Sequence, residues 1–265
     1  MADLAVASAL AGLAAEVAGC RRCPRLVEYR AAVAARPRAA YRGETYWARP
    51  VPGFGDPSAR LLIIGLAPAA HGANRTGRMF TGDSSGDWLF RALHRAGFAD
   101  RPDARSRDDG LTLRDCYITA SCRCAPPGNR PTVDELAACR PFLERELALL
   151  GRVRVVVVLG RIAFDTYLRI RQQQGWGWPA MDDLDDGTSG PPGRGKVPEA
   201  GRDRAAGSGR KPVFGHGRVY RWGVERPVLI ASYHPSRQNT NTGVLTEAMF
   251  DQVFAAARLL LTRGR

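Results

Sequence analysis

Four short apolar runs, separated by longer amphipathic stretches, most constrain how this 265-residue chain can fold. Each run has the length of a buried strand, and together they cover 61–64, 116–119, 155–159 and 228–231. Helical patterns lie between and after these runs, at about 85–97, 132–150, 161–171 and 244–263. Strands that alternate with helices form a mainly parallel sheet covered on both faces. We therefore predict an α/β fold: a single three-layer domain with a central, mainly parallel four-stranded sheet flanked by helices.

One stretch, 172–212, departs from this alternation. It carries an acidic patch at 182–186, followed by a run rich in Gly, Pro and Arg with few apolar residues. A segment of this composition buries little apolar surface, so we predict a flexible insertion and not a domain linker. Residues 1–265 are accordingly predicted to form one domain.

The loops that follow the predicted strands are candidate ligand-binding segments, because ligands of such sheets bind at the carboxyl ends of the strands. These loops begin at Gly65, Ala120, Gly160 and Ser232. The 65–83 loop is rich in small residues, which let backbone amides approach an anion closely, and it also holds His71 and Asp83. The 232–243 loop is polar, contains His234-Pro-Ser236 and lacks acidic residues, which suits contact with DNA.

The chain is strongly basic, with 39 Lys and Arg against 26 Asp and Glu and a formal net charge of +13. A basic surface attracts polyanions, so this composition favours a nucleic-acid partner. No segment reaches the roughly 18 consecutive apolar residues that a membrane span requires. We expect a monomer with no membrane partner.

Six cysteines are present, two near the start and four between 116 and 139. This grouping is typical of metal ligation in a reducing, cytoplasmic setting, because a chain this long needs no disulfides. Cys20-x-x-Cys23 together with Cys124 and Cys139 supplies four thiolates, which suit zinc or an iron–sulfur cluster. Cys122 is an alternative to Cys124 as a ligand. Cys116 lies inside an apolar strand and is predicted to be a core residue.

The N-terminal segment 4–19 ends in Val17-Ala-Gly-Cys20, which resembles a bacterial lipoprotein cleavage site. It lacks a positively charged start, however, and Glu16 interrupts the apolar run. An amphipathic helix explains the segment better, with one face formed by Leu4, Leu10, Leu13 and Val17.

Taken together, these features resemble the iron–sulfur uracil-DNA glycosylases, most closely the family 5 branch called type b. The matching segments are Cys20-x-x-Cys23, Gly65-Leu-Ala-Pro68, Arg75-Thr-Gly-Arg-Met-Phe-Thr-Gly-Asp83, Cys124-Ala-Pro-Pro-Gly-Asn-Arg-Pro131 running on to Cys139, and His234-Pro-Ser236. They occur in the family's order across residues 20–236. The resemblance implies a bacterial enzyme, associated with the nucleoid through DNA binding, that removes uracil from damaged double-stranded DNA.

The resemblance also implies a role for each motif. The third metal ligand of the family directly precedes Pro-Pro, which here is Cys124 and not Cys122, and the cofactor is a structural 4Fe–4S cluster. Base-binding positions are Gly65, Ala67, Phe80, Ala120 and His234, with Phe80 stacking on the flipped base. DNA-contacting positions are Arg75, Ser236, Arg237, Gln238 and Asn239.

Catalysis is expected from His234 and Asp83. His234 would stabilise the departing base anion, together with backbone amides of the 65–83 loop. Asp83 would position or deprotonate the attacking water, or stabilise the cationic sugar. The residues alone also allow a purely structural role for Asp83, as the N-cap of a helix that starts near Ser84.

Two departures from related enzymes bear on specificity. The segment Gly65-Leu-Ala-Pro68 offers no polar side chain near the scissile bond, and Ala120 stands where relatives often carry an Asn that reads the base. A pocket without such a group rejects analogues poorly, so we expect other damaged bases, such as hypoxanthine or ethenocytosine, to be accepted.

A non-enzymatic zinc module that binds nucleic acid would also explain the cysteines and the charge. It leaves the loops that carry Asp83 and His234 without a role. A redox enzyme is a third alternative, but no flavin or nicotinamide signature supports it.

Overall fold

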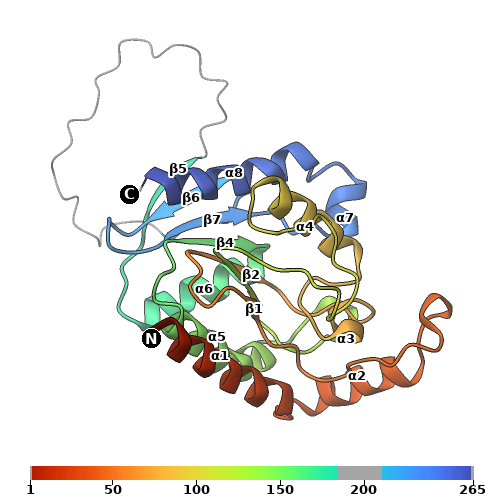
Figure 1. The fold of residues 1–265 in the computed structure, drawn as a ribbon. Helices are drawn as coiled ribbons and strands as arrows, with labels where there is room; N and C mark the ends of the chain where they lie inside the picture. The colour runs from red at the N-terminus through yellow and green to blue at the C-terminus, as the bar shows by residue number, and fades with distance from the viewer. Residues whose placement is uncertain (1, 184–210, 264–265) are drawn as a thin grey trace, which may run out of the picture.

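The computed structural model describes residues 2–183 and 211–263, and its centre is one twisted sheet (Figure 1). The sheet order is β1-β3-β2-β4-β7-β6-β5. The strand bounds are β1 (Phe54–Gly55), β2 (Leu61–Gly65), β3 (Cys116–Ala120), β4 (Val155–Leu159), β5 (Ala180–Asp183), β6 (Arg218–Arg221) and β7 (Val228–Ser232).

The four predicted strands form the parallel centre of this sheet, in the order β3-β2-β4-β7. The predicted strand count was too low, because the sheet has seven strands. The additional strands β1, β5 and β6 pair antiparallel at the two edges. They have two to four residues each and no continuous apolar run, so they lack the local sequence signal of a buried strand.

The helices cover both faces of the sheet, which confirms the three-layer prediction (Figure 1). Their bounds are α1 (Ala2–Gly19), α2 (Pro24–Ala35), α3 (Ala73–Thr76), α4 (Ser84–Arg95), α5 (Val133–Leu149), α6 (Arg161–Gln173), α7 (Arg237–Asn241) and α8 (Glu247–Arg263), with short 3-10 turns η1 (Ala39–Tyr41) and η2 (Pro127–Asn129). Leu61 and Ile63 of β2 pack with α4 and α8, whereas Leu62 and Ile64 pack with α1, α5 and α6. This alternation follows from the two-residue period of a strand.

Local signals set where several of these helices begin. Thr132 and Glu135 form both hydrogen bonds of a capping box at the start of α5. In α1, Leu10, Leu13 and Val17 are buried, as an amphipathic helix requires, while Leu4 is exposed. In the described part of the chain, no single helix is long and apolar enough to cross a membrane. The helices α1 and α2 taken together have sufficient length and apolar content, but they are bent by 83° at the break between them.

Most of the predicted insertion, residues 184–210, lies outside the described residues. The part of it that the structure describes contains the last turn of α6 and strand β5. Trp176 and Trp178 pack against the core on the side of α6, and β5 pairs with β6.

Candidate active site and cysteine cluster

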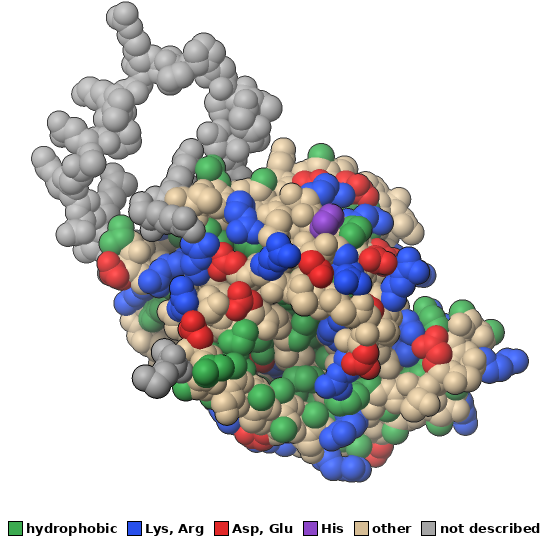
Figure 2. All heavy atoms as spheres, viewed as in Figure 1, with side chains coloured by type: hydrophobic (Ala, Val, Ile, Leu, Met, Phe, Trp, Pro, Cys, Tyr) green, Lys and Arg blue, Asp and Glu red, His purple; other side chains and the backbone are tan. Residues whose placement is uncertain are grey.

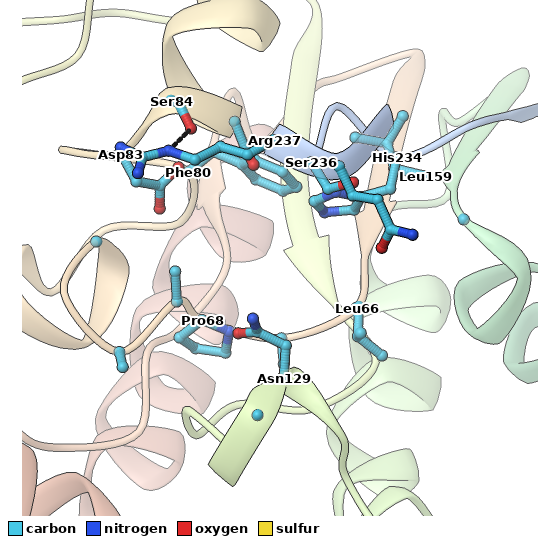
Figure 3. A pocket seen from close by; sticks show the side chains of 18 of the residues that line it. Leu66, Pro68, Phe80, Asp83, Ser84, Asn129, Leu159, His234, Ser236 and Arg237 are labelled. Atoms are coloured by element: carbon cyan, nitrogen blue, oxygen red, sulfur yellow. Dashed lines mark hydrogen bonds between the residues drawn. The ribbon is translucent and has the colours of Figure 1, made fainter. Parts of the chain in front are cut away.

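A cavity of about 900 Å³ opens where the carboxyl ends of the parallel strands meet (Figure 3). Both predicted loops line it, the first through residues 66–72 and 79–85 and the second through residues 233–239. Residues 128–130 and 159–162 complete this part of the lining. The parallel register brings these segments together, since β2, β4 and β7 end at the same edge of the sheet.

Asp83 is both a helix cap and a cavity residue. Its Oδ1 accepts a hydrogen bond of 3.0 Å from the backbone N–H of Gly86, so it is the N-cap of α4. Its other oxygen lies against Gly72, where the Cβ of any other residue would overlap Oδ2. Burial raises the pKa of this carboxyl, although the backbone N–H groups of Gly86 and Ser85 act in the opposite direction. A carboxylate with a raised pKa is a better proton acceptor.

Phe80 is held in an unusual backbone conformation beside the second loop. Its φ is +54°, a region that bulky residues rarely adopt and that is found most often at functional sites. Two glycines make room for it: a Cβ on Gly65 would come within 2.8 Å of the Phe80 ring, and a Cβ on Gly86 would overlap the Phe80 carbonyl oxygen. The Phe80 ring stacks on His234, with centroids 5.9 Å apart and an interplanar angle of 28° (Figure 3).

His234 follows β7 directly, and its ring faces the cavity (Figure 3). Its backbone carbonyl accepts a hydrogen bond of 2.9 Å from the Asn239 side-chain amide, which fixes the loop around it. Burial lowers the pKa of its imidazole to about 4, so the ring is neutral at physiological pH. Among the described residues neither ring nitrogen has a hydrogen-bond partner, which leaves one N–H donor available to a ligand.

The predicted DNA-contacting residues of the second loop differ in their surroundings. The Ser236 hydroxyl accepts a hydrogen bond of 3.3 Å from Asn239 N and caps α7. Arg237 is exposed, and its Nε donates a hydrogen bond of 3.1 Å to the Ser84 hydroxyl, which joins the two loops (Figure 3). Gln238 is exposed without a side-chain partner among the described residues.

Three other predicted residues, Gly65, Arg75 and Ala120, do not line the cavity. The Arg75 side chain is 10% exposed and forms an ion pair with Glu44. It also donates to the carbonyls of His71 and Gly82, so it holds the first loop together. Ala120 is 1% exposed and belongs to the core under β3. Ala67, by contrast, lines the cavity as predicted.

Several cavity residues were absent from the predicted site, among them Tyr29, Arg38, Tyr41 and Asn129. Only Asn129 had a local signal, because Gly128 and Asn129 both adopt left-handed backbone conformations and Gly-Asn is typical of such turns. The other three reach the cavity through the packing of α2 and η1, which no local pattern predicts.

The four predicted metal ligands line a second, small cavity. Cys20, Cys23, Cys124 and Cys139 all contribute to it, whereas Cys122 does not. Cys122 is instead fully buried, and its thiol donates to the Cys124 carbonyl oxygen. In the described residues no three His, Cys, Asp or Glu side chains are grouped closely enough to hold a single metal ion. A cluster of four irons requires less convergence of the sulfurs than one zinc ion, which needs each at about 2.3 Å.

The surroundings of two buried arginines indicate whether an anionic group fits this cavity. Arg30 donates a hydrogen bond of 2.9 Å from its guanidinium to Cys124 Sγ. Arg123, which is 1% exposed, pairs with Glu146 at 2.5 Å, but its Nε and Nη1 have no hydrogen-bond partner among the described residues. Buried donors without acceptors are costly. Four thiolates around a 4Fe–4S cluster would carry net negative charge beside these guanidinium groups, so the residues present fit such a group.

The cysteine thiols also differ in the direction in which their pKa values are shifted. The Cys122 thiol and the backbone and charge of Arg123 lower the pKa of Cys139, which favours the thiolate that metals bind. Burial raises the pKa of Cys124 to about 12, although Arg30 acts in the opposite direction.

Comparison with known proteins finds matches over most of the chain. Residues 52–258 match the model of the uracil DNA glycosylase superfamily. A Type-5 uracil-DNA glycosylase of Mycobacterium leprae is 45% identical over 257 residues, covering 96% of each chain. The Type-5 uracil-DNA glycosylase of Thermus thermophilus is 47% identical over 91% of this chain and 93% of its own. That of Pyrobaculum aerophilum is 42% identical, over 90% and 87% respectively.

Proposed function

Because this chain belongs to the uracil DNA glycosylase superfamily, in its type-5 branch, we propose that its large cavity hydrolyses the bond between uracil and deoxyribose in double-stranded DNA. The family makes the chain a DNA glycosylase, a hydrolase that acts on DNA and leaves an abasic site. The observation that carries the proposal is that a carboxyl group and an imidazole, those of Asp83 and His234, lie in the lining of one cavity.

Recognition begins with the phosphate backbone, which a chain of net charge +13 attracts without regard to sequence. The target nucleotide must then leave the duplex, at a cost of a few kcal/mol that is smallest for a mispaired base. Arg237 and Gln238, exposed at the mouth of the cavity, are placed to contact the backbone of the distorted strand. Phe80 offers its ring face to the extruded base.

His234 acts on the leaving group. As the C1′–N bond breaks, negative charge develops on the base and positive charge on the sugar. A neutral imidazole stabilises the base anion by donating a hydrogen bond from its N–H, without transferring the proton. The pKa of about 4 suits this role, because the ring keeps one donor over the physiological range and carries no competing charge.

Asp83 acts on the nucleophile. Its carboxylate accepts a proton from the water that attacks C1′, so the water oxygen becomes the C1′ hydroxyl of the abasic site and the base departs as an anion. Gly72 leaves room for Oδ2, while Oδ1 is occupied by the Gly86 N–H. The carboxylate is therefore held in one orientation by the helix that it caps.

Cys20, Cys23, Cys124 and Cys139 would hold a 4Fe–4S cluster, with Arg30 and Arg123 donating to its sulfurs. When bound, the cluster supplies cross-links between the N-terminal helices and the β3–α5 segment and takes part in no bond-breaking step. Iron content of the purified protein and absorption near ~400 nm test this assignment. A colourless protein that contains zinc would instead support a zinc site.

We further propose that the cavity accepts hypoxanthine and ethenocytosine. Ala120 supplies no polar group and lies outside the lining, so selection against analogues must come from elsewhere. Asn129, whose side-chain amide faces the cavity, is the residue best placed to bias that choice (Figure 3). A preference for uracil over hypoxanthine above ~10⁴-fold would contradict the proposal.

The decisive experiment is an alkali-cleavage assay on a duplex that contains a single uracil. Wild type should produce alkali-sensitive abasic sites, and His234→Ala should be slower by about 10²–10³-fold, the cost of losing one oxyanion donor. A wild-type protein that leaves uracil and the other damaged bases in place would refute the glycosylase proposal and favour a binding module.

A further inference from the structure

The large cavity exceeds what one flipped base requires. Its volume is about 900 Å³, whereas sites for complete small ligands begin at about 300 Å³. One part of the lining, around Phe80, Asp83 and His234, holds the flipped nucleotide in the proposed function. Another part, which we call the N-terminal wall, consists of Tyr29 of α2 together with Arg38 and Tyr41 at η1.

The N-terminal wall is firmly attached to the loop that carries Asp83. The Arg75 guanidinium lies 4.0 Å from the centroid of the Tyr41 ring, and the His71 ring lies nearly parallel to it, at 6.3 Å and 24°. His71 is in turn hydrogen-bonded at 2.9 Å to the Tyr46 hydroxyl. Arg75, predicted to contact DNA, thus supports Tyr41, and the wall has a fixed position relative to the catalytic loop.

Tyr29 and Arg38 are available to a ligand. Tyr29 is partly exposed and Arg38 is exposed. Within residues 2–183 and 211–263, their side chains make no hydrogen bond, ion pair or ring contact. Figure 1 shows α2 and the segment after it extending past α3 at the edge of the molecule, and Figure 2 shows basic side chains at the tip of this segment.

The charge of the lining indicates the chemistry of the ligand. Among its described residues Asp83 is the one carboxylate, while the guanidinium groups are those of Arg38, Arg130, Arg161 and Arg237. Guanidinium groups bind phosphodiesters, and tyrosine faces stack on bases whatever their identity. Aromatic and basic residues combined in one groove are typical of sites for unpaired nucleotides.

We propose that the N-terminal wall binds the nucleotide next to the flipped one on the damaged strand, with its base on the Tyr29 ring and its phosphate on Arg38. This inference rests on the proposed function. A second nucleotide then occupies the excess cavity volume. Its binding holds the strand in its distorted form while the glycosidic bond of the flipped nucleotide is hydrolysed.

Four duplexes test the proposal, each with one uracil. One is complete; the others lack the base on the 5′ side of the uracil, on its 3′ side, or opposite to it, with all phosphates retained. Initial rates are measured for wild type, Tyr29→Ala, Tyr29→Phe and Arg38→Ala. Arg36→Ala is the matched control, because Arg36 is exposed two residues away and does not line the cavity.

On the complete duplex Tyr29→Ala should lower kcat/KM by about 5- to 100-fold, mainly through KM, as loss of one stacking contact predicts. Tyr29→Phe should behave as wild type, since it keeps the ring face. One of the two neighbouring bases stacks on Tyr29 in this proposal. On the duplex that lacks that base, kcat/KM of wild type should fall to the value of Tyr29→Ala, and kcat/KM of Tyr29→Ala should not fall further. Arg38→Ala should weaken the salt dependence of KM, and Arg36→Ala should not.

Equal losses by Tyr29→Ala on the complete duplex and on both neighbour-lacking duplexes would overturn the proposal. So would a loss that disappears when the opposite base is removed, because the wall would then bind the other strand. An equal effect of Arg36→Ala would also overturn it. A wild type inactive on the complete duplex refutes the proposed function instead, and the wall is then tested by the affinity of the same variants for a duplex with an abasic analogue.

Discussion

At the scale of single residues, Asp83 both caps a helix and lines the cavity. One carboxylate oxygen caps α4, and the other faces the cavity over Gly72. The sequence allowed either role as an alternative; the structure shows the cap and also places the side chain in the cavity lining, where the proposed catalytic role requires it. Replacements that keep the cap therefore separate the two roles.

Asp83→Asn should lower the rate of uracil release by about 10²–10⁴-fold, because the amide cannot accept the proton of the water. It should leave α4 capped, since Asn is as good an N-cap as Asp. Asp83→Ala should in addition lower the free energy of unfolding by about 1 kcal/mol. Single-turnover rates and urea denaturation measure the two effects, and an unchanged rate in Asp83→Asn would remove Asp83 from the chemistry.

The pH dependence should distinguish Asp83 from His234. Burial raises the pKa of Asp83 above 3.8, so activity that needs the carboxylate should decline on the acidic side as pH falls through that raised value. His234, with a pKa of about 4, stays neutral above it and should contribute no inflection near its ordinary value of 6.5. A profile of kcat/KM between pH 4 and 9 checks this. An inflection near 6.5 that is lost in His234→Ala would contradict the neutral assignment.

Arg30 should matter for the cluster more than for the fold. It donates to Cys124 Sγ, so Arg30→Met should speed the loss of iron to a chelator by removing a charge-assisted hydrogen bond. Arg25→Met is the matched control on the same helix, because Arg25 pairs with Glu135 and lies outside the cysteine cavity. Equal iron loss in the two variants would indicate general loosening of α2 and not a contact with the cluster.

At the scale of elements, one histidine joins three of them behind the second loop. His216, just before β6, accepts a hydrogen bond of 3.1 Å from Tyr233 N at its Nδ1, and the backbone of Met249 in α8 acts to raise its pKa. Burial lowers its pKa, so the neutral form that accepts this bond prevails above the ordinary value of 6.5. His216 is therefore a positioning residue for His234.

His216→Leu should lower kcat/KM by about tenfold or more, because small displacements of a reacting group are costly. His216→Asn should recover much of that loss, since its amide oxygen can replace Nδ1 as the acceptor. Circular dichroism controls for folding. A His216→Asn variant as slow as His216→Leu would argue that the ring is needed for packing alone, for example against Tyr233 at 5.1 Å.

The sequence patterns predicted some of the helices and strands and not others. The parallel strands and the helices α4, α5, α6 and α8 were predicted within a few residues, because buried runs and amphipathic periods leave local signals. The edge strands β1, β5 and β6 were missed. Such short strands are determined by the backbone that they pair with, which lies far away in sequence for β1 and β5 and in the next strand for β6.

At the scale of the whole molecule, the cysteine cavity joins the N-terminal helices to the β3–α5 segment. Cys139→Ser should therefore lower iron content and the thermal midpoint together, and raise amide exchange in α2 and in the N-terminal wall. Cys116→Ala, in the core of β3, should retain iron. Hydrogen exchange with metal analysis measures both. Iron loss without increased exchange in α2 would show that the cluster does not brace these helices.

The sequence by itself determined the fold class and the family, and it identified both loops that line the cavity. Strand and helix periods, the capping box at Thr132 and the motifs around Cys20, Asp83 and His234 are local, so they can be read without coordinates. The tertiary structure decided what those motifs meet: that Arg75 is an internal support, that Arg123 keeps unpaired donors beside the cysteines, and that Tyr29 reaches the cavity. Apart from the bonds of Arg75 within its own loop, these contacts join distant segments, and only the register of the sheet and the packing of its helices bring them together.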